Sequence, residues 1–592
     1  MKKHNYTKYL MAALLMAGAA FVSCTKDEEP LPVVGQTYTM TVNATKGGDN
    51  ASKDSGSKQL TPADHSITAT WAEGEAVTVY NVTKGAALSG TLTAQSSGAS
   101  TTLKGSLTGT IENGDVLKLK FLSPSYSAQD GTLTGTASSI DKVCDYAEAS
   151  VTVTNAATSS VTTTDADFHN KQAIVKFTLK DIATGNPAIN ATKLTVTAGE
   201  TTITVTPSSA SSELYVAIPS ISGQAVDLSA NVGYYIYTYN RAGVTFDNSQ
   251  YYEITVMMTK HAVNLAAVTS NFTAANGDVL TGTLGSNVQI SIANGATITL
   301  ENARLAPSSH PGLTCLGNAT INLVGENTTN GGTFYAGVLI GGEETTLTIN
   351  GPGSLSATGG LQSSGIGLSR SWSAGTVKGG SIVINGGTIT ARGNPSQWGA
   401  GIGTGVSYSS TVSIKNITIN GGDVTAIGGA NGCAGIGTSY TYTSASSAVG
   451  NITINGGSVT ATGTNDAAAI GTGHTADGCS ASVGNITISG GTVTATCSSS
   501  CPTVIGCVTN GTCGDIELTT APTFTLNNPN NSGSSVSLRS FVDTDENIIF
   551  PMATMNPGSI IMLDVGFWVN YFDDVKFGCP ETAQEFIYMP KN

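Results

Sequence analysis

Residues 417–437 read ITINGGDVTAIGGANGCAGIG, and residues 452–471 repeat the pattern as ITINGGSVTATGTNDAAAIG. In both copies, apolar residues alternate with Thr on each side of an Asn-Gly-Gly turn. Because successive residues of a β-strand face opposite sides, one side of each strand is apolar and the other carries Thr. The stretch therefore predicts short strands joined by tight turns.

Two markers from this stretch recur along the chain at a nearly constant interval. The turn Asn is followed by the next after 34 or 35 residues, at Asn350, Asn385, Asn420 and Asn455, with Ser489 in the last place. The Ile-Gly dipeptide recurs every 34 to 36 residues, at Ile366, Ile402, Ile436, Ile470 and Ile505. Units of this length with about three strands each are typical of a parallel β-solenoid, whose rungs stack about 4.8 Å apart.

The expected fold class is all-β, with two N-terminal β-sandwich domains followed by a parallel β-helix and a C-terminal cap. The repeat predicts the β-helix over residues 263–525. Residues 526–592 lack the repeat, and we interpret them as the cap, with an independent small domain as the alternative. Residues 35–165 and 166–262 alternate apolar and polar residues in short runs between turns, which predicts two antiparallel sandwiches.

The chain begins with a targeting segment. Three Lys in the first eight residues precede an apolar run over residues 10–22, which is too short to span a bilayer comfortably. The run ends in FVSC at Cys24, which resembles a bacterial lipobox. We expect a signal peptide over residues 1–23, a tether over residues 24–34 and lipidation, including palmitate, at Cys24. An ordinary secretory signal with a chance Cys is the alternative.

The residues that follow Cys24 read TKDEEP. They resemble the surface-export signal of lipoproteins in anaerobic Gram-negative bacteria, and a solvated acidic linker is the alternative. The resemblance implies a lipoprotein anchored in the outer membrane and exposed on the cell surface. Stable anchoring needs more than one acyl chain, which fits a multiply acylated Cys.

The N-terminal half also resembles a known family. Residues 67–80, ITATWAEGEAVTVY, resemble the signature of fimbrillin-like lipoproteins, and residues 170–177, NKQAIVKF, resemble the strand that opens their second domain. Residues 251–256, YYEITV, resemble their closing strand. The resemblance covers residues 35–262. It implies two β-sandwiches and a role in adhesion or surface assembly, and it supplies no binding residue.

The repeat itself resembles bacterial extracellular β-helix proteins described as carbohydrate-binding. The likeness rests on Glu326-Asn327, on GPGSL at residues 351–355 and on the Asn-Gly-Gly turns, and it covers most of residues 285–510. Some of these relatives bind acidic plant polysaccharide with calcium. This sequence has no repeated acidic pair, which argues against a calcium-dependent mode.

Aromatic residues follow the Ile-Gly marker at fixed positions, although aromatics make up only 6% of the chain. Five residues after the marker Gly stand Trp372, Tyr408 and Tyr442, and three residues after it stand Tyr440 and His474. If the loops stack like their rungs, the rings form a stripe that Trp398 borders and that suits an extended glycan. The alternative is that the rings cover the loop bases or pack on each other.

Four cysteines near the end of the repeat are candidates for disulfides. Cys479 and Cys513 occupy similar places in adjacent loops, and Cys497 and Cys501 flank three Ser residues. Exported proteins permit disulfides. A zinc site would require paired Cys-x-x-Cys or His spacing, which the sequence lacks. We therefore expect disulfides or free thiols, and no metal site.

The remaining residues argue against catalysis. Enzymes on β-helices need neighbouring carboxylates for acid–base work or metal binding, whereas the charges of this repeat are scattered. We expect no enzyme activity and no cofactor, although a polysaccharide-degrading enzyme remains the least favoured alternative. A net charge of −14 without a basic patch argues against nucleic acid as a partner.

We therefore expect a surface adhesin or glycan-binding protein that uses the loop face of the β-helix. Its expected partners are the outer membrane, through the lipid anchor, and a polysaccharide or host glycan. The alternative is a structural or anchoring subunit of a fimbria-like assembly, with fimbrial subunits as partners. In such an assembly a donated strand completes a sandwich.

Overall fold

The computed structural model describes residues 35–46, 60–63, 66–122, 126, 128–372, 374–497, 504–508, 510–514, 516–518, 523–527, 535–539, 553–555, 560–564 and 575–578. The expectations for residues 1–34, Cys24 among them, and for Cys501 lie outside these ranges. The chain divides into two compact units, Met1–Val232 with Tyr237–Lys260, and Gly233–Ile236 with His261–Asn592. In the described ranges no helix is long and apolar enough to cross a membrane.

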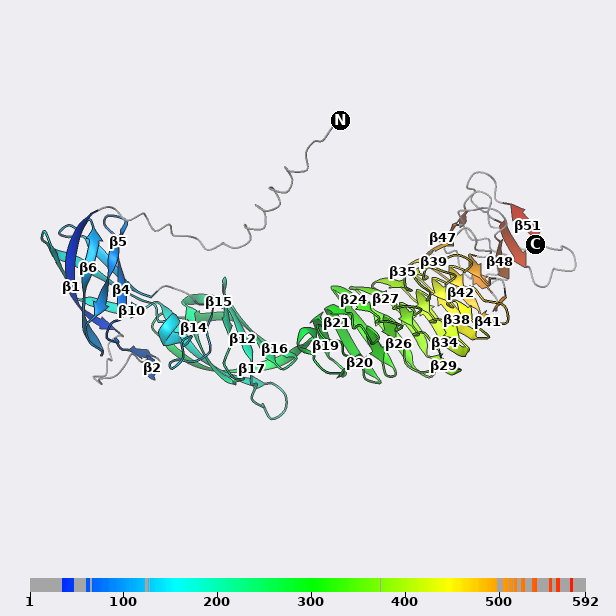
Figure 1. Cartoon of the computed structure of the whole chain (residues 1–592), viewed down its shortest axis with the longest axis horizontal. Helices are drawn as coiled ribbons and strands as arrows, with labels where there is room; N and C mark the ends of the chain where they lie inside the picture. Colours follow the sequence, from blue (N-terminus) through cyan, green and yellow to red (C-terminus); the bar gives the residue numbers. More distant parts are fainter. Residues whose placement is uncertain are drawn as a thin grey trace, which may run out of the picture. The chain divides into compact units, whose positions relative to one another are not determined.

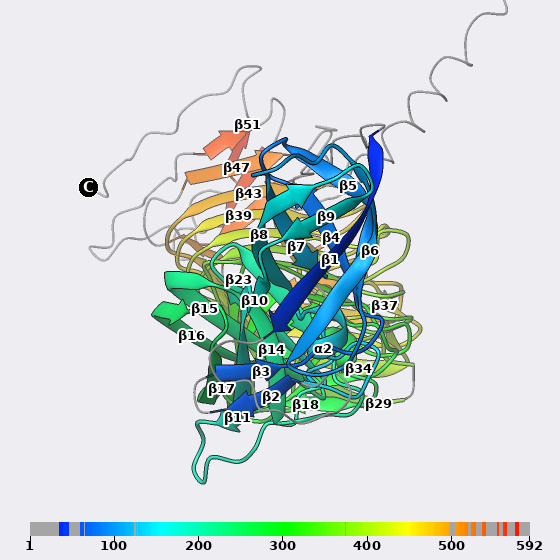
Figure 2. The ribbon, with the colours of Figure 1, turned by 90° about the vertical axis from the view of Figure 1, so that its left-hand side faces the viewer.

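The first β domain is a sheet of eight strands that closes on itself. Its order is β10 (Ala166–Asn170), β1 (Gln36–Lys46), β6 (Ser100–Gly109), β5 (Ala86–Ala94), β4 (Ala76–Asn81), β7 (Val116–Phe121), β8 (Ala147–Ala156) and β9 (Ser160–Thr163). Further pairings of β10 with β8 and of β1 with β9 close it. Figures 1 and 2 both show β1 and β6 side by side. Alternate residues of β1 are buried, because their side chains face the enclosed core.

The second β domain has two sheets that share one core. Strands β11 (Gln172–Asp181), β14 (Glu213–Pro219) and β17 (Tyr251–Asn264) form one sheet, and β12 (Lys193–Ala198), β13 (Thr201–Val205) and β15 (Ile221–Val232) belong to the other. Buried residues of both sheets, such as Val175 and Leu228, belong to a single hydrophobic cluster. The two layers therefore stabilise each other by burying their inner faces.

The N-terminal sheets are not wholly antiparallel, and in this detail the prediction was wrong. Strand β1 pairs in parallel with both β9 and β10, and β11 pairs in parallel with β17. Period-two alternation reports which face of a strand is buried, and both pairing directions satisfy it. The strand partners are set by contacts between segments that are distant in the sequence.

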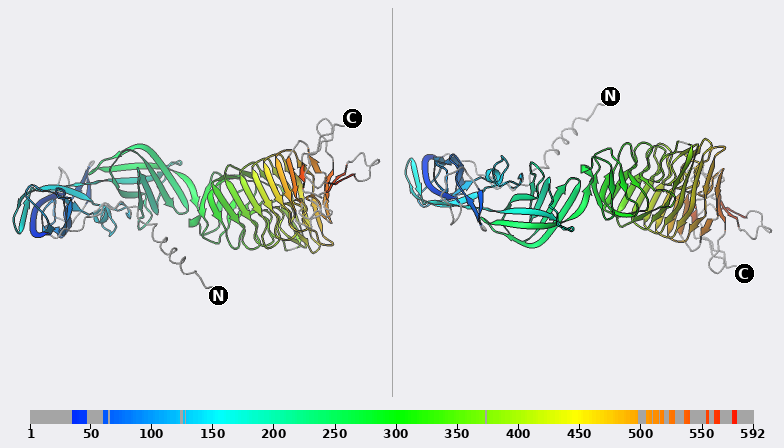
Figure 3. Two further views of the ribbon diagram at one scale, coloured as in Figure 1. Left: turned by 90° about the horizontal axis from the view of Figure 1, so that it is seen from above. Right: turned by 90° about the horizontal axis from the view of Figure 1, so that it is seen from below.

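The described residues from β18 (Phe272–Ala274) to β46 (Ile516–Leu518) form the parallel β-helix that the repeat predicts, so the all-β class is confirmed. One face stacks β26 (Thr346–Asn350), β30 (Ser381–Ile384), β34 (Ser410–Ile419), β38 (Ser446–Ile454) and β42 (Ile486–Ile488). The next face stacks β27 (Ser354–Thr358), β31 (Thr388–Arg392), β35 (Asp423–Ile427), β39 (Ser458–Thr462) and β43 (Thr492–Thr496). Figure 3 shows these rungs stacked side by side.

The third face consists of two-residue strands that hold the Ile-Gly marker. They are β28 (Ile366–Gly367), β32 (Ile402–Gly403), β36 (Ile436–Gly437), β40 (Ile470–Gly471) and β44 (Ile505–Gly506), all paired in parallel. The glycine is needed because an added Cβ on Gly437 would lie 1.8 Å from the carbonyl oxygen of Gly471 on the next rung. Its φ of +140° also disfavours other residues.

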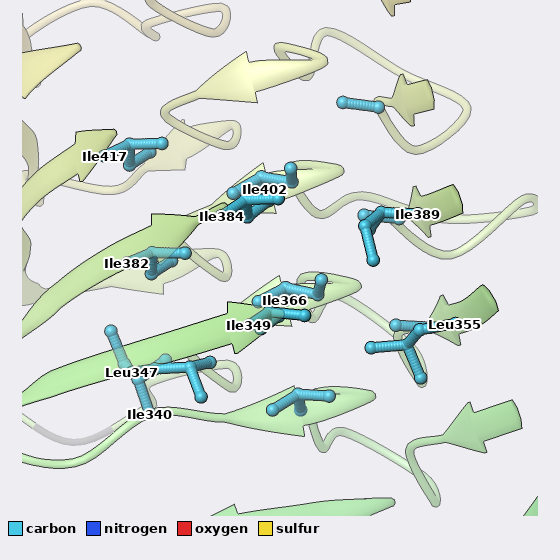
Figure 4. Close-up of a cluster of buried hydrophobic side chains, with 14 of the residues drawn as sticks. Ile340, Leu347, Ile349, Leu355, Ile366, Ile382, Ile384, Ile389, Ile402 and Ile417 are labelled. Carbon is cyan, nitrogen blue, oxygen red and sulfur yellow. The ribbon is translucent and has the colours of Figure 1, made fainter. Parts of the chain in front are cut away.

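The interior is filled by columns of aliphatic side chains. Figure 4 shows Ile349 below Ile384 on one face, and Leu355 below Ile389 on the next. All four side chains are at most 1% exposed. Full burial of one such side chain is worth about 1.5–3 kcal/mol, which offsets part of the conformational entropy lost when a rung becomes ordered.

The turn asparagines form a ladder of amide hydrogen bonds on the surface. The Nδ2 group of Asn420 donates to Oδ1 of Asn385 at 2.8 Å, and that of Asn455 donates to Oδ1 of Asn420 at 2.8 Å. The ladder starts at Asn322 and ends where the Ser489 hydroxyl donates to Asn455 at 2.9 Å. The amides bond each other, which fits a structural role.

The parallel ladder extends past residue 525. Strand β47 (Thr523–Asn527) pairs with β43, and β49 (Ala553–Met555) pairs in turn with β47. A separate small sheet contains β48 (Ser535–Arg539), β50 (Ile560–Asp564) and β51 (Val575–Gly578). The segment that we interpreted as a cap, residues 526–592, therefore contributes β49 and the last two residues of β47 to the stack.

Candidate functional site

The loops that follow the Ile-Gly strands keep the register of the rungs. Strand β33 (Ser407–Tyr408) pairs in parallel with β37 (Thr441–Tyr442), so that Tyr408 lies opposite Tyr442. Single bridges join Ser371 to Ser407 and Thr441 to Thr475 in the same direction. Residues at equal positions after the marker therefore lie above one another on successive rungs.

This register brings the first three predicted rings into one column. The ring centroids of Trp372 and Tyr408 are 4.3 Å apart with an interplanar angle of 25°, so the rings stack. Tyr408 and Tyr442 are 5.5 Å apart at 62°, in an edge-to-face arrangement. Trp372 is 57% exposed and Tyr442 is 44% exposed, so both ends of the column present ring surface to solvent.

A second column lies beside the first. Tyr440 stacks on His474 with centroids 4.9 Å apart, and it contacts Tyr442 at 5.8 Å and Trp398 at 5.4 Å. The structure thus brings all five predicted residues together, with Trp398 at their border. We call this set the aromatic strip: Trp372, Trp398, Tyr408, Tyr440, Tyr442 and His474.

Arg370 extends the strip, although it is one of the scattered charges of the repeat. Its guanidinium carbon lies 3.2 Å from the ring centroid of Phe334 and 4.3 Å from that of Trp372. Arg370 stands three residues after Gly367, the offset at which Tyr440 and His474 follow their own markers. The same counting, applied to charged residues, would have found it.

Polar groups line the edges of the strip. Arg370 Nη1 donates to Oε1 of Gln362 at 3.0 Å, and Gln362 Nε2 donates to the Tyr408 hydroxyl oxygen at 2.8 Å. At the other end, His474 Nδ1 lies 3.6 Å from Oδ2 of Asp466. Hydrogen-bonding groups therefore flank a surface of aromatic rings.

Burial shifts the pKa of Arg370, Tyr408 and Tyr440 in the direction that favours the uncharged form of each side chain. It lowers the pKa of the Arg370 guanidinium from its usual value and raises the pKa of the Tyr408 and Tyr440 phenols. The guanidinium is charged and both phenols are protonated at neutral pH.

Groups of three or more His, Cys, Asp or Glu residues that could hold a metal do not occur in the described part of the chain.

The cysteine geometry corrects one predicted pairing. Cys513 is bonded to Cys507, with Cα atoms 5.7 Å apart, and Cys479 is a free thiol. Strand β45 (Gly511–Cys513) pairs with β41 (Ser480–Val483) in a register that puts Cys513 opposite Val483. Cys479 precedes that strand, so the two cysteines are not aligned. Cys497 is a buried thiol, and its predicted partner Cys501 lies outside the described residues.

We expect thiol alkylation of the native protein to reach Cys479 well before Cys315 or Cys433. Cys479 is half-buried, whereas the other two are buried. Burial raises the pKa of Cys315 to about 12 and also raises that of Cys433, which depletes the reactive thiolate. Timed iodoacetamide labelling at mildly alkaline pH, followed by peptide mapping, measures the order. If iodoacetamide alkylated Cys315 and Cys479 of the folded protein at equal rates, the result would contradict the burial of Cys315.

One family model matches five segments of the chain between residues 347 and 500. It describes a beta helix repeat and matches residues 347–369, 382–406, 417–440, 452–474 and 486–500. These segments contain Asn350, Asn385, Asn420, Asn455 and Ser489 of the ladder and Trp398, Tyr440 and His474 of the strip, whereas Trp372, Tyr408 and Tyr442 lie just outside them. No curated protein matches the sequence.

Solved structures resemble the N-terminal part of the chain. A candidate cell adhesion protein from Bacteroides fragilis is 13% identical, with 36% of this chain and 92% of that chain covered and a TM-score of 0.21. A fimbrial assembly protein from Parabacteroides distasonis is 13% identical, with coverages of 37% and 91% and a TM-score of 0.22. The tip fimbrial protein of Porphyromonas gingivalis is 9% identical, with coverages of 37% and 95% and a TM-score of 0.21.

Proposed function

We propose that this chain is a cell-surface adhesin whose aromatic strip binds an extended glycan and does not act on it as an enzyme. The observation that carries the proposal is the register of the strip. Rings recur on successive rungs, and Trp372 and Tyr442 expose 57% and 44% of their surface. Exposed aromatic rings in a fixed row are unusual in a chain with 6% aromatics.

The chemistry of the strip suits a sugar chain. Aromatic faces pack against the apolar C–H faces of sugar rings, while flanking donors and acceptors bind hydroxyl groups. Arg370 and Gln362 supply such groups at one end, and His474 and Asp466 supply them at the other. Four rungs span about 14 Å at the normal strand spacing, which exceeds a single sugar unit.

The strip is also held in place before a ligand arrives. Trp372 stacks on Tyr408, and the Tyr408 hydroxyl accepts a hydrogen bond from Gln362. Side chains that are already ordered lose little conformational entropy on binding, which favours affinity. The proposal includes anchoring to the outer membrane through a lipidated Cys24, which displays the strip outside the cell.

The test is a glycan array probed with the full chain and with a triple variant, Trp372→Ala, Tyr408→Ala and Tyr442→Ala. Each aromatic contact is worth about 0.5–1.5 kcal/mol, so we expect at least about tenfold weaker binding by the variant. Leu316→Ala is the matched control, because Leu316 is 55% exposed on the same unit and outside the strip. Parallel arrays with calcium and with EDTA are expected to agree.

Three outcomes would count against the proposal. Binding that the triple variant retains would remove the strip as the site. No binding on a broad array by the folded chain would favour the alternative of a structural subunit in a fimbria-like assembly. Cleavage of a bound glycan during the assay would contradict the absence of enzyme activity.

A further inference from the structure

A lysine and two carboxylates meet inside the first β domain. The Lys46 Nζ atom lies 2.9 Å from Oδ2 of Asp145 and 3.5 Å from Oε2 of Glu75. The side chains of Lys46 and Asp145 are both 0% exposed, and that of Glu75 is 12% exposed. A buried lysine is uncommon, because removing an ammonium from water is costly unless the charge is compensated.

Aromatic rings enclose this group. Lys46 Nζ lies 3.5 Å from the ring centroid of Phe121 and 4.8 Å from that of Trp71. Trp71 in turn packs edge-on against Phe121 at 5.6 Å and against Phe168 at 5.1 Å. The rings cover the lysine, so its amine and the carboxyl group of Asp145 meet away from bulk water.

The backbone fixes both reacting side chains. Lys46 is the last residue of β1, and its N–H donates to the carbonyl of Ala99 at 3.0 Å. Asp145 lies between the short helix α2 (Ile140–Val143) and β8. The Glu75 carboxylate accepts a hydrogen bond from the N–H of Ala72 at 3.2 Å, which orients it. Groups held in contact in this way react as if they were present at very high concentration.

We propose that Lys46 and Asp145 condense into an intramolecular isopeptide bond, with Glu75 as the proton carrier. The Lys46 ammonium gives one proton to the Glu75 carboxylate and becomes a neutral amine. The amine nitrogen attacks Cγ of Asp145, and a C–N bond forms. One carboxyl oxygen of Asp145 then takes one proton from Glu75 and one from the nitrogen, its C–O bond breaks, and it leaves as water. Glu75 returns to its carboxylate, and no oxidant or reductant is consumed.

The bond would tie the first strand of the domain to the segment before β8. The two residues are roughly 100 positions apart, so the cross-link closes a large part of the domain into a ring and restricts its unfolded state. An uncharged amide also replaces an ion pair that is costly to keep away from water. This inference is independent of the glycan-binding proposal.

The test is a tryptic peptide map of the purified full chain after denaturation. If the bond forms, trypsin cannot cleave after Lys46, so residues 27–53 stay in one peptide that is joined to residues 143–171. The branched peptide is lighter than the sum of the two by one water. Free peptides ending at Lys46, with no branched product, would overturn the proposal.

Variants assign the roles of the three residues. Glu75→Gln keeps both reacting groups, and we expect it to yield mainly unlinked chain. Asp145→Asn offers a carboxamide, so any branched peptide that it forms arises by loss of ammonia instead of water. The internal control is Lys118, whose Nζ lies 3.4 Å from Glu148 with a side chain that is 37% exposed. Trypsin is expected to cleave normally after Lys118. An isopeptide bond between Lys118 and Glu148 would show that proximity alone is sufficient. That result would overturn the roles assigned to Glu75 and to burial of the site.

Discussion

The substitution Gly437→Ala is expected to lower the free energy of unfolding of the solenoid by about 3 kcal/mol, at the upper end of the range for overpacking. The new Cβ would lie 1.8 Å from the carbonyl oxygen of Gly471, which belongs to the backbone of the next rung. This clash is relieved only if the two rungs move apart, which would weaken the β36–β40 pairing. The φ of +140° adds strain for any residue with a side chain.

Chemical denaturation of the full chain, followed by far-UV circular dichroism, measures the effect as a shift in the transition of the solenoid. Gly342→Ala is the matched control, because an added Cβ there meets nothing within 4 Å and its φ is not positive. We expect the control to change stability by less than about 0.5 kcal/mol. Equal stability of the two variants would mean that the rungs are further apart than described.

The second large effect is expected in the first β domain. Trp71→Ala should destabilise that domain by about 3–5 kcal/mol, the usual range for removal of a buried large aromatic side chain. Trp71 is 0% exposed and packs edge-on against Phe121 and Phe168. The cavity would also remove one of the rings that cover Lys46.

Trp372→Ala is the control for this prediction, since that ring is 57% exposed and its loss leaves no internal cavity. The first β domain and the solenoid have separate hydrophobic clusters, so a chain of this kind is expected to unfold in more than one transition. Differential scanning calorimetry should show Trp71→Ala moving one transition and leaving that of the solenoid in place. A shift of both transitions would show that the first β domain and the solenoid unfold together.

The sequence allowed the solenoid to be predicted because stacked rungs repeat the same side chains in the same places. Ile417 lies over Ile452 and Tyr408 lies over Tyr442 because the number of residues per rung is nearly constant. Counting from the Ile-Gly marker therefore located the aromatic strip. Counting failed for Cys513, because the register of β45 is set by its own pairing with β41.

Other features leave no periodic trace in the sequence. Lys46 and Asp145 are brought together by the closure of the first sheet, through pairings between distant strands. Alternation of apolar and polar residues does not specify these partners, and a lysine at the end of a strand is normally exposed. Arg370 was missed for a different reason, because its charge alone does not indicate that the guanidinium lies over the rings of Phe334 and Trp372.

The near-identity of successive rungs has a consequence for how such a chain varies through recombination. Ile417 lies opposite Ile452, and Asn416 lies opposite Asn451, so deletion of one whole repeat joins two surfaces that already fit. Duplication does the same, and each amide of the ladder then finds an equivalent neighbour. Misaligned exchange between repeated DNA would therefore alter the number of rungs while preserving the fold, so length can vary in whole units without redesign of the interior.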